Sequence, residues 1–136
     1  MGKGATTSND VLKCLLIGTD PSYRTNATLY VALHSANPTA AGNQTSSEVA
    51  YDNYTRRPIT KATGWTDNGT NFTNAAQILF PVCGVTGATA RYVSIGESDT
   101  GGAGQIYYVG QLSADLTIAQ NIQPLFSIGN LQVTES

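Results

Sequence analysis

Short β-rich segments, separated by clusters of Gly, Pro, Asn and Asp, make up the chain after Tyr23. Segments of this kind, with no helical pattern between them, indicate an antiparallel sandwich or barrel. We therefore predict a mainly β fold, an antiparallel β-sandwich of jelly-roll type over residues 24–136. The predicted strands are 28–35, 54–60, 76–80, 90–97, 105–113 and 124–135, with a further short strand at 115–119.

One short α-helix is predicted before the strands, at residues 9–17. Its apolar residues recur at helical spacing, Ser8, Asn9 or Asp10 can cap its start, and Gly18 can end it. Residues 1–8 are small and polar, so we predict a flexible arm there. At 136 residues, without an internal repeat or a charged linker, the chain is predicted to form a single domain, 1–136.

The charge content is low and excludes two classes of partner. Seven Lys and Arg residues oppose nine Asp and Glu residues, and charged residues make up only 12% of the chain. No field of either sign is strong enough to concentrate nucleic acid or anionic lipid. The apolar stretch at 11–18 is too short to span a bilayer, and no signal peptide is recognised, so we expect folding in a cytoplasm. Cys14 and Cys83 are predicted to be reduced and buried.

His34, the single histidine, is the first residue to test for catalysis. A catalytic or metal-binding histidine needs partners, and the sequence offers no second histidine and no recognisable nucleophile motif. Strand alternation places His34 with Tyr30 and Ala32, opposite the aliphatic side chains of the same strand. We interpret it as a solvated or hydrogen-bonding residue at the end of a strand.

Other polar groups also have simpler structural interpretations. Glu97 and Asp99 beside a glycine cluster supply too few ligands for calcium, and a β-turn is favoured there. Glu48 and Asp52 are the nearest candidate for a hydrolase carboxylate pair, but nothing positions a substrate between them. Trp65 is assigned to the core, with an interface anchor as the alternative. We therefore predict no enzyme activity, no catalytic residue, no metal site and no cofactor.

The order of several motifs resembles a family of small virion proteins of tailed bacteriophages, labelled tail-fibre-like or minor structural proteins. The motifs are "LYVALH" followed by "YDNYTRRPI", "GW" leading to "NAAQILFP", "YVGQL" after a glycine turn, and a closing "FSIGNLQVT". The resemblance runs from the N-terminal helix to the end of the chain. It implies a structural protein made in the host bacterial cytoplasm and carried in the phage particle.

Within that resemblance, the expected function is capsid decoration, a cement protein that binds the assembled head lattice. The expected partners are the major capsid protein and the protein itself, with no nucleic acid and no membrane. The alternative is a tail-tip or tail-fibre-associated protein with a receptor-binding or adaptor role. Receptor or glycan binding at a tail tip would be favoured if Tyr51, Tyr54 and Trp65 formed an exposed cluster. The predicted interface residues, in the N-terminal arm and around the 36–54 loop, are Lys3, Thr6, Thr7, Tyr51, Tyr54, Arg56 and Arg57.

Overall fold

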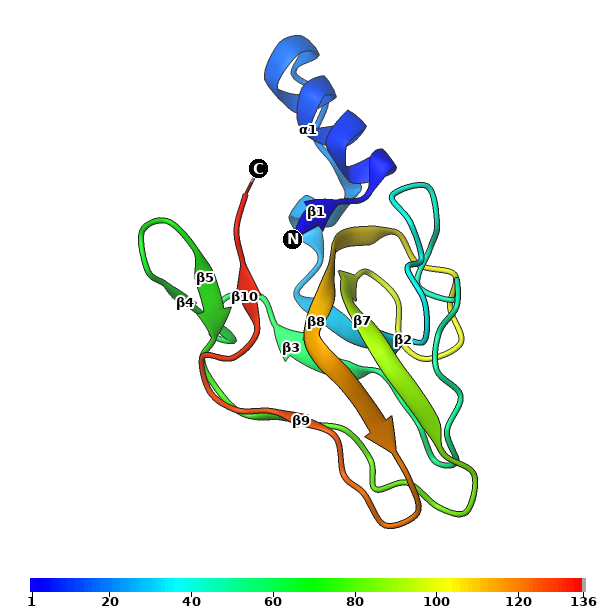
Figure 1. The fold of residues 1–136 in the computed structure, drawn as a ribbon. Helices are drawn as coiled ribbons and strands as arrows, with labels where there is room; N and C mark the ends of the chain where they lie inside the picture. The colour runs from blue at the N-terminus through cyan, green and yellow to red at the C-terminus, as the bar shows by residue number, and fades with distance from the viewer. Residues whose placement is uncertain (136) are drawn as a thin grey trace.

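The computed structural model describes residues 1–135, which form one α-helix, one 3-10 helix and ten strands (Figure 1). The helices are α1 (Ala5–Ile17) and the 3-10 helix η1 (Ser22–Thr25). The strands are β1 (Gly2–Lys3), β2 (Thr28–His34), β3 (Arg57–Thr60), β4 (Trp65–Asp67), β5 (Phe72–Asn74), β6 (Ile78–Leu79), β7 (Ala88–Gly96), β8 (Ile106–Ile118), β9 (Leu125–Phe126) and β10 (Gln132–Val133).

The strands pair into three antiparallel sheets. The main sheet has five strands in the order β1-β8-β7-β2-β3, beside a three-stranded sheet β10-β5-β4 and the pair β6-β9. The prediction of a mainly β, antiparallel fold with one N-terminal helix is confirmed. These three sheets do not establish the predicted two-sheet jelly roll, because the smaller sheets are built from strands of only two or three residues.

The hydrophobic core lies against the main sheet. Val31 and Leu33 of β2 and Val93 and Ile95 of β7 are almost completely buried in it. Phe80 extends the core toward the smaller sheets. Its ring stacks on Tyr54 with the centroids 6.4 Å apart and meets Phe126 edge-on at 6.2 Å. Aromatic pairs in these geometries stabilise a core beyond their buried area.

Several predicted strands have different bounds in the structure. The segments 105–113 and 115–119 join into the single strand β8, whose pairing with β7 shifts register between Ala90 and Tyr92. The segment 124–135 divides into β9 and β10 around Gly129, which has φ 81°. The strand predicted at 54–60 forms only at Arg57–Thr60, and it is an edge strand, as Pro58 in its sequence indicated.

Helix α1 begins at Ala5, four residues before the predicted start, and Gly4 is its N-cap. The cause is tertiary: Thr7 Oγ1 donates to the Ile106 carbonyl at 2.8 Å, and Gln105 Nε2 donates to Asp10 at 3.0 Å. The residues predicted as a flexible arm therefore form β1 and the first turn of α1. The predicted end is confirmed, because Gly18 has φ 74° and closes the helix. Within residues 1–135, no helix is long and apolar enough to cross a membrane.

Candidate interaction surfaces

The two tyrosines predicted as contacts in the 36–54 loop are held inside the molecule. Tyr51 is buried, and its hydroxyl donates to the Pro81 carbonyl at 2.6 Å. Burial raises the pKa of this hydroxyl to about 12. The Tyr54 hydroxyl donates to Glu48 Oε2 at 2.7 Å and accepts from the Leu33 amide at 3.2 Å. Trp65 lies in β4 and, like Tyr54, is only partly exposed. Because Tyr51 is buried as well, the exposed aromatic cluster that would favour receptor binding does not form.

Arg56, also predicted as a surface contact, is completely buried beside Glu48. Its Nε donates to Glu48 Oε2 at 2.7 Å, and its Nη2 donates to Oε1 at 2.9 Å. The remaining nitrogen, Nη1, donates to the carbonyls of Ser98 and Asp99 at 3.0 and 2.8 Å. All of these bonds tie the 36–54 loop to the glycine turn near residue 100, so the side chain cannot contact a partner in this conformation.

The other predicted contacts differ in their accessibility. Thr7 is buried against β8, whereas Thr6 is exposed on α1. Lys3 forms an ion pair with Glu135, which links β1 to the C-terminal segment. Arg57 is partly exposed at the edge strand β3. Of the seven predicted interface residues, Thr6 is exposed in the described structure, Lys3, Tyr54 and Arg57 are partly buried, and the other three are buried.

His34 is buried rather than solvated, and both ring nitrogens have partners. Nδ1 lies 2.8 Å from the Ser46 carbonyl, and Nε2 lies 2.7 Å from Ser94 Oγ. Since Nδ1 faces a carbonyl, it carries the proton, and Nε2 accepts from the Ser94 hydroxyl. Burial lowers the pKa of His34 and favours this neutral form. The residue therefore connects β2, the loop and β7, as the hydrogen-bonding interpretation predicted.

The acidic residues weighed for chemistry have structural partners. Glu48 is paired with Arg56, while Asp52 Oδ2 accepts from the Val85 amide at 3.1 Å. Near Asp99, the loop carbonyls that could have faced a cation accept from the Arg56 guanidinium instead. Within residues 1–135, no group of three His, Cys, Asp or Glu residues is placed to hold a metal ion.

The most exposed apolar surface lies on the C-terminal half of α1. Leu15, Leu16 and Ile17 are 76, 78 and 75% exposed, and Leu12 is half exposed. We call these four residues the helix stripe. Only the first turns of α1 are anchored to β8, and the rest of the helix extends away from the sheets (Figure 1). Exposed apolar patches of this kind mark interaction sites in folded proteins.

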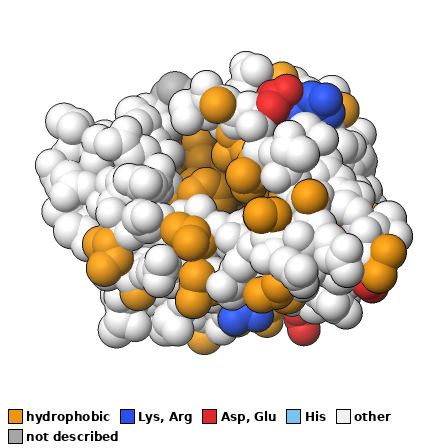
Figure 2. Space-filling model, turned by 60° about the horizontal axis from the view of Figure 1, so that its bottom comes forward, with side chains coloured by type: hydrophobic (Ala, Val, Ile, Leu, Met, Phe, Trp, Pro, Cys, Tyr) orange, Lys and Arg blue, Asp and Glu red, His pale blue; other side chains and the backbone are white. Residues whose placement is uncertain are grey.

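A second apolar surface lies at the opposite end of the molecule, on the loops that follow β6 and β8 and on the adjoining strand pair. These loops are joined by hydrogen bonds, from the Cys83 amide to the Ile122 carbonyl at 2.8 Å and from the Asn121 amide to the Cys83 carbonyl at 2.9 Å. Figure 2 brings this end forward and shows several groups of hydrophobic side chains and few charged ones. We define the distal patch as Leu79, Val82, Val85, Ile122 and Leu125.

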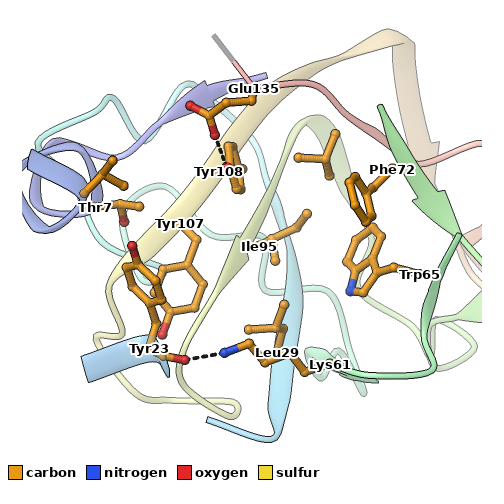
Figure 3. Close-up of a pocket in the computed structure, with 12 residues that line it drawn as sticks. Thr7, Tyr23, Leu29, Lys61, Trp65, Phe72, Ile95, Tyr107, Tyr108 and Glu135 are labelled. Carbon is orange, nitrogen blue, oxygen red and sulfur yellow. Dashed lines mark hydrogen bonds between the residues drawn. The ribbon is translucent and has the colours of Figure 1, made fainter. Parts of the chain in front are cut away.

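A pocket of about 380 Å³ lies between the main sheet, the three-stranded sheet and the base of α1 (Figure 3). We call it the aromatic pocket, because its wall contains the rings of Tyr23, Trp65, Phe72, Tyr107 and Tyr108. Tyr23 meets Tyr107 edge-on at 5.4 Å, and the Tyr107 hydroxyl accepts from Asn26 Nδ2 at 2.9 Å. Burial raises the pKa of Tyr107 to about 12, so its phenol stays uncharged.

Two hydrogen-bond donors in the wall of the pocket have unused capacity. The indole Nε1 of Trp65 is buried and has no acceptor among residues 1–135. Figure 3 shows this nitrogen on the side of the ring that faces the pocket. Lys61 Nζ uses two of its three N–H groups, on the carbonyls of Tyr23 and Arg24. An occupant of this pocket therefore needs an apolar body and an acceptor oxygen.

Sequence reasoning missed all three of these surfaces. The helix stripe was visible as an apolar periodicity, but periodicity does not say whether a face is covered. The pocket joins residues from α1, η1 and all three strands of the three-stranded sheet. Two of those strands, β4 and β5, carry no alternating pattern in the sequence. Cys14 lies on the same helix and is exposed, contrary to the prediction, whereas Cys83 is buried as expected.

Exposed apolar surfaces on a weakly charged β framework indicate a protein that contacts other molecules. A family model described as "Podophage GP4 fiber I protein gp80" matches residues 2–134. Because the match covers nearly the whole chain, the chain belongs to this family of phage tail fibre proteins. It is therefore a structural component of the virion, and membership implies a non-enzymatic role. No curated protein matches the chain.

The family corrects one expectation about position in the particle. Capsid decoration is not supported, because the matching family is described as a fibre protein. The alternative, a tail-fibre protein, is the better description. The sequence motifs did not separate the two positions, since a strand order and a glycine turn report the fold and not the location of the partner.

Proposed function

We propose that the protein is an adaptor subunit of the tail fibre, which joins two components of the virion through the helix stripe and the distal patch. The observation that carries this proposal is the exposure of Leu15, Leu16 and Ile17, each about three-quarters accessible. Burying one such side chain contributes about 1.5–3 kcal/mol. A stable isolated protein gains nothing from leaving three of them in water, so a partner surface is expected to cover them.

The distal patch supports the bridging role because of its position. Val85 is 77% exposed, as accessible as the helix stripe, yet it belongs to the end of the molecule remote from α1. The sheets between the two ends are held by antiparallel pairing of β7 with β2 and, with two shifts of register, with β8. A rigid body with one apolar surface at each end is suited to transmit force between two neighbours in a fibre.

Particles that carry variants of this protein test the proposal. The variants are Leu16→Gln on the helix stripe and Val85→Gln on the distal patch, with Thr70→Gln, exposed and on neither surface, as the control. Copies per particle are measured by quantitative mass spectrometry, and the position is determined by cryo-electron microscopy.

An adaptor predicts two different defects. Particles with one variant should lack the protein. Particles with the other variant should retain the protein but lack the virion component that attaches to it, while particles with the control variant should match the unmodified phage. The proposal fails if both variants assemble normally. It also fails if the protein is found at high copy number over the capsid shell.

A further inference from the structure

We propose that the helix stripe of one copy packs into the aromatic pocket of a second copy, so that the protein self-associates through α1. This inference rests on the proposed function and names the partner that covers the helix stripe. The pocket and the stripe belong to the same chain, and each supplies what the other lacks. Three features of the described residues match: apolar shape, hydrogen-bonding capacity and charge.

The apolar match is between aliphatic side chains and an aromatic wall. The stripe presents Leu15, Leu16 and Ile17 on the end of a helix that stands clear of the sheets. The pocket presents aromatic rings on two sides and aliphatic side chains of β2 and β7 on its floor (Figure 3). Its volume of about 380 Å³ is that of a binding site, larger than a packing void.

The hydrogen-bonding match is between free carbonyls and a buried donor. At the end of α1, the amides of Gly18 and Thr19 bond the carbonyls of Cys14 and Lys13. The carbonyls of Leu15, Leu16 and Ile17 lie beyond this cap and accept no hydrogen bond from residues 1–135. These groups are acceptors without donors, whereas Trp65 Nε1 in the pocket is a buried donor without an acceptor.

The charge match follows from the direction of the helix. The C-terminus of an α-helix carries a partial negative charge, which a nearby cation stabilises. No basic residue lies in the last turn of α1, so this end has no cation of its own. Lys61 lies in the wall of the pocket, where its ammonium group donates to the carbonyl oxygens of Tyr23 and Arg24. The one carboxylate in the same lining, that of Glu135, is paired with Lys3. Docking would place the negative end of one helix next to this ammonium group.

The position of the pocket explains why the occupant is a second copy. Thr7 and Val11, in the first half of α1, line the pocket, so it lies at the base of the same helix. With 13 residues α1 is about 20 Å long, and its tip points away from its own pocket. Two copies arranged with their helices antiparallel bring each tip to the base of the other. Such a contact is two-fold symmetric and closes, which is the commonest arrangement of self-associating proteins.

Oligomeric state in solution tests the proposal with the full chain. Light scattering after size exclusion, over a concentration series, should give a self-associated species for the unmodified protein. Leu16→Gln should raise the dissociation constant at least tenfold, because a buried leucine is lost from each contact. Ile128→Gln removes an aliphatic side chain that is 68% exposed and lies on neither of the two apolar surfaces, so it should leave the dissociation constant unchanged. A monomer at all concentrations, or equal effects of the two variants, would overturn the proposal.

Trp65 gives a direct readout of the pocket, since it is the single tryptophan of the chain. Its indole N–H resonance should move downfield with concentration as Nε1 gains an acceptor. In a mixed sample, one set of copies carries a spin label on Cys14, the exposed cysteine, and the other set carries ¹⁵N. The spin label should broaden the Trp65 indole resonance of the ¹⁵N-labelled copies. Trp65→Phe keeps a ring but removes the donor, and it should weaken association about fivefold. An indole resonance that neither shifts nor broadens would place the contact elsewhere.

These results separate the two proposals. If the isolated protein is monomeric but Leu16→Gln still disturbs particle assembly, self-association is wrong and the adaptor role stands with another partner on the helix stripe. If the protein self-associates through α1 but both stripe and patch variants assemble into normal particles, the adaptor role is wrong.

Discussion

The guanidinium of Arg56 holds the carboxylate of Glu48 through two parallel hydrogen bonds, at 2.7 and 2.9 Å, in a site from which solvent is nearly excluded. This pair is the centre of the network that fixes the 36–54 loop. Arg56 also donates to two carbonyls of the glycine turn, and Tyr54 donates to Glu48. The residues expected to bind a partner therefore determine the shape of the loop from inside.

Replacing one member of this pair should destabilise the fold strongly. Glu48→Gln leaves the Arg56 charge buried without a counter-charge, and we expect a loss of about 3–5 kcal/mol in the free energy of unfolding. The matched control is Asp115→Asn, which removes the partner of Arg91 in an ion pair whose side chains are 46 and 59% exposed. That change should cost less than about 1 kcal/mol. Urea unfolding followed by circular dichroism measures both, and similar losses would contradict the assigned role of the buried pair.

The stability of the protein should depend on pH through His34. Burial lowers the pKa of His34 in the folded state, while the unfolded chain titrates near 6.5. The unfolded state therefore binds the proton more readily, so the contribution is fully present above about pH 6.5 and decreases as the pH falls toward the folded pKa. Urea midpoints at pH 7.5 and 5.5 measure the decrease. In His34→Gln this part of the pH dependence should be absent, and an unchanged dependence would show that other groups cause it.

Gly4 should be required for seating α1 on the sheet. A Cβ atom at this position would lie 2.2 Å from the Ile106 carbonyl oxygen, so Gly4→Ala must displace the backbone of β8 or of the helix start. We expect a loss of about 1–3 kcal/mol in the free energy of unfolding. Gly2→Ala is the control, since a Cβ there meets no atom within 4 Å. If thermal unfolding finds both variants as stable as the unmodified protein, α1 is not packed as described.

Tyr51 should contribute to stability and not to binding. Tyr51→Phe keeps the ring in the core but removes the hydrogen bond to Pro81, and it should cost about 1 kcal/mol. Tyr51→Ala also leaves a cavity, and it should cost about 3–5 kcal/mol. Denaturant unfolding of the isolated protein tests this order. A Tyr51→Ala variant with normal stability and reduced attachment to particles would restore the original prediction of a surface contact.

The sequence was a reliable guide where apolar residues recur at a short period. The alternation in "TLYVALH" predicted β2 within one residue, because strand geometry imposes a period of two. The polar strands β4 and β5 carry no such pattern, and they form because Trp65 and Asn74 are paired partners in the folded sheet. Their existence depends on tertiary contacts that no local segment specifies.

The start of α1 and the burial of Tyr51 and Arg56 were not predicted, for a related reason. Ser8, Asn9 and Asp10 are good capping residues, yet the helix begins earlier because contacts between Thr7, Asp10 and β8 stabilise its first turns. Arg56 resembled a surface charge because nothing near it in the sequence identifies Glu48 as its partner. Neither the composition nor the periodicity of a sequence predicts a buried ion pair between two distant segments.

The pairing of β1 with β8 also sets the order in which this protein can fold. Gly2 and Lys3 lie opposite Val109 and Tyr108, more than a hundred residues later in the chain. During translation, α1 therefore has no platform until β8 has left the ribosome, and its leucines emerge long before that. A nascent chain cannot hold this helix against the sheet, so α1 reaches its final position only after the main sheet exists.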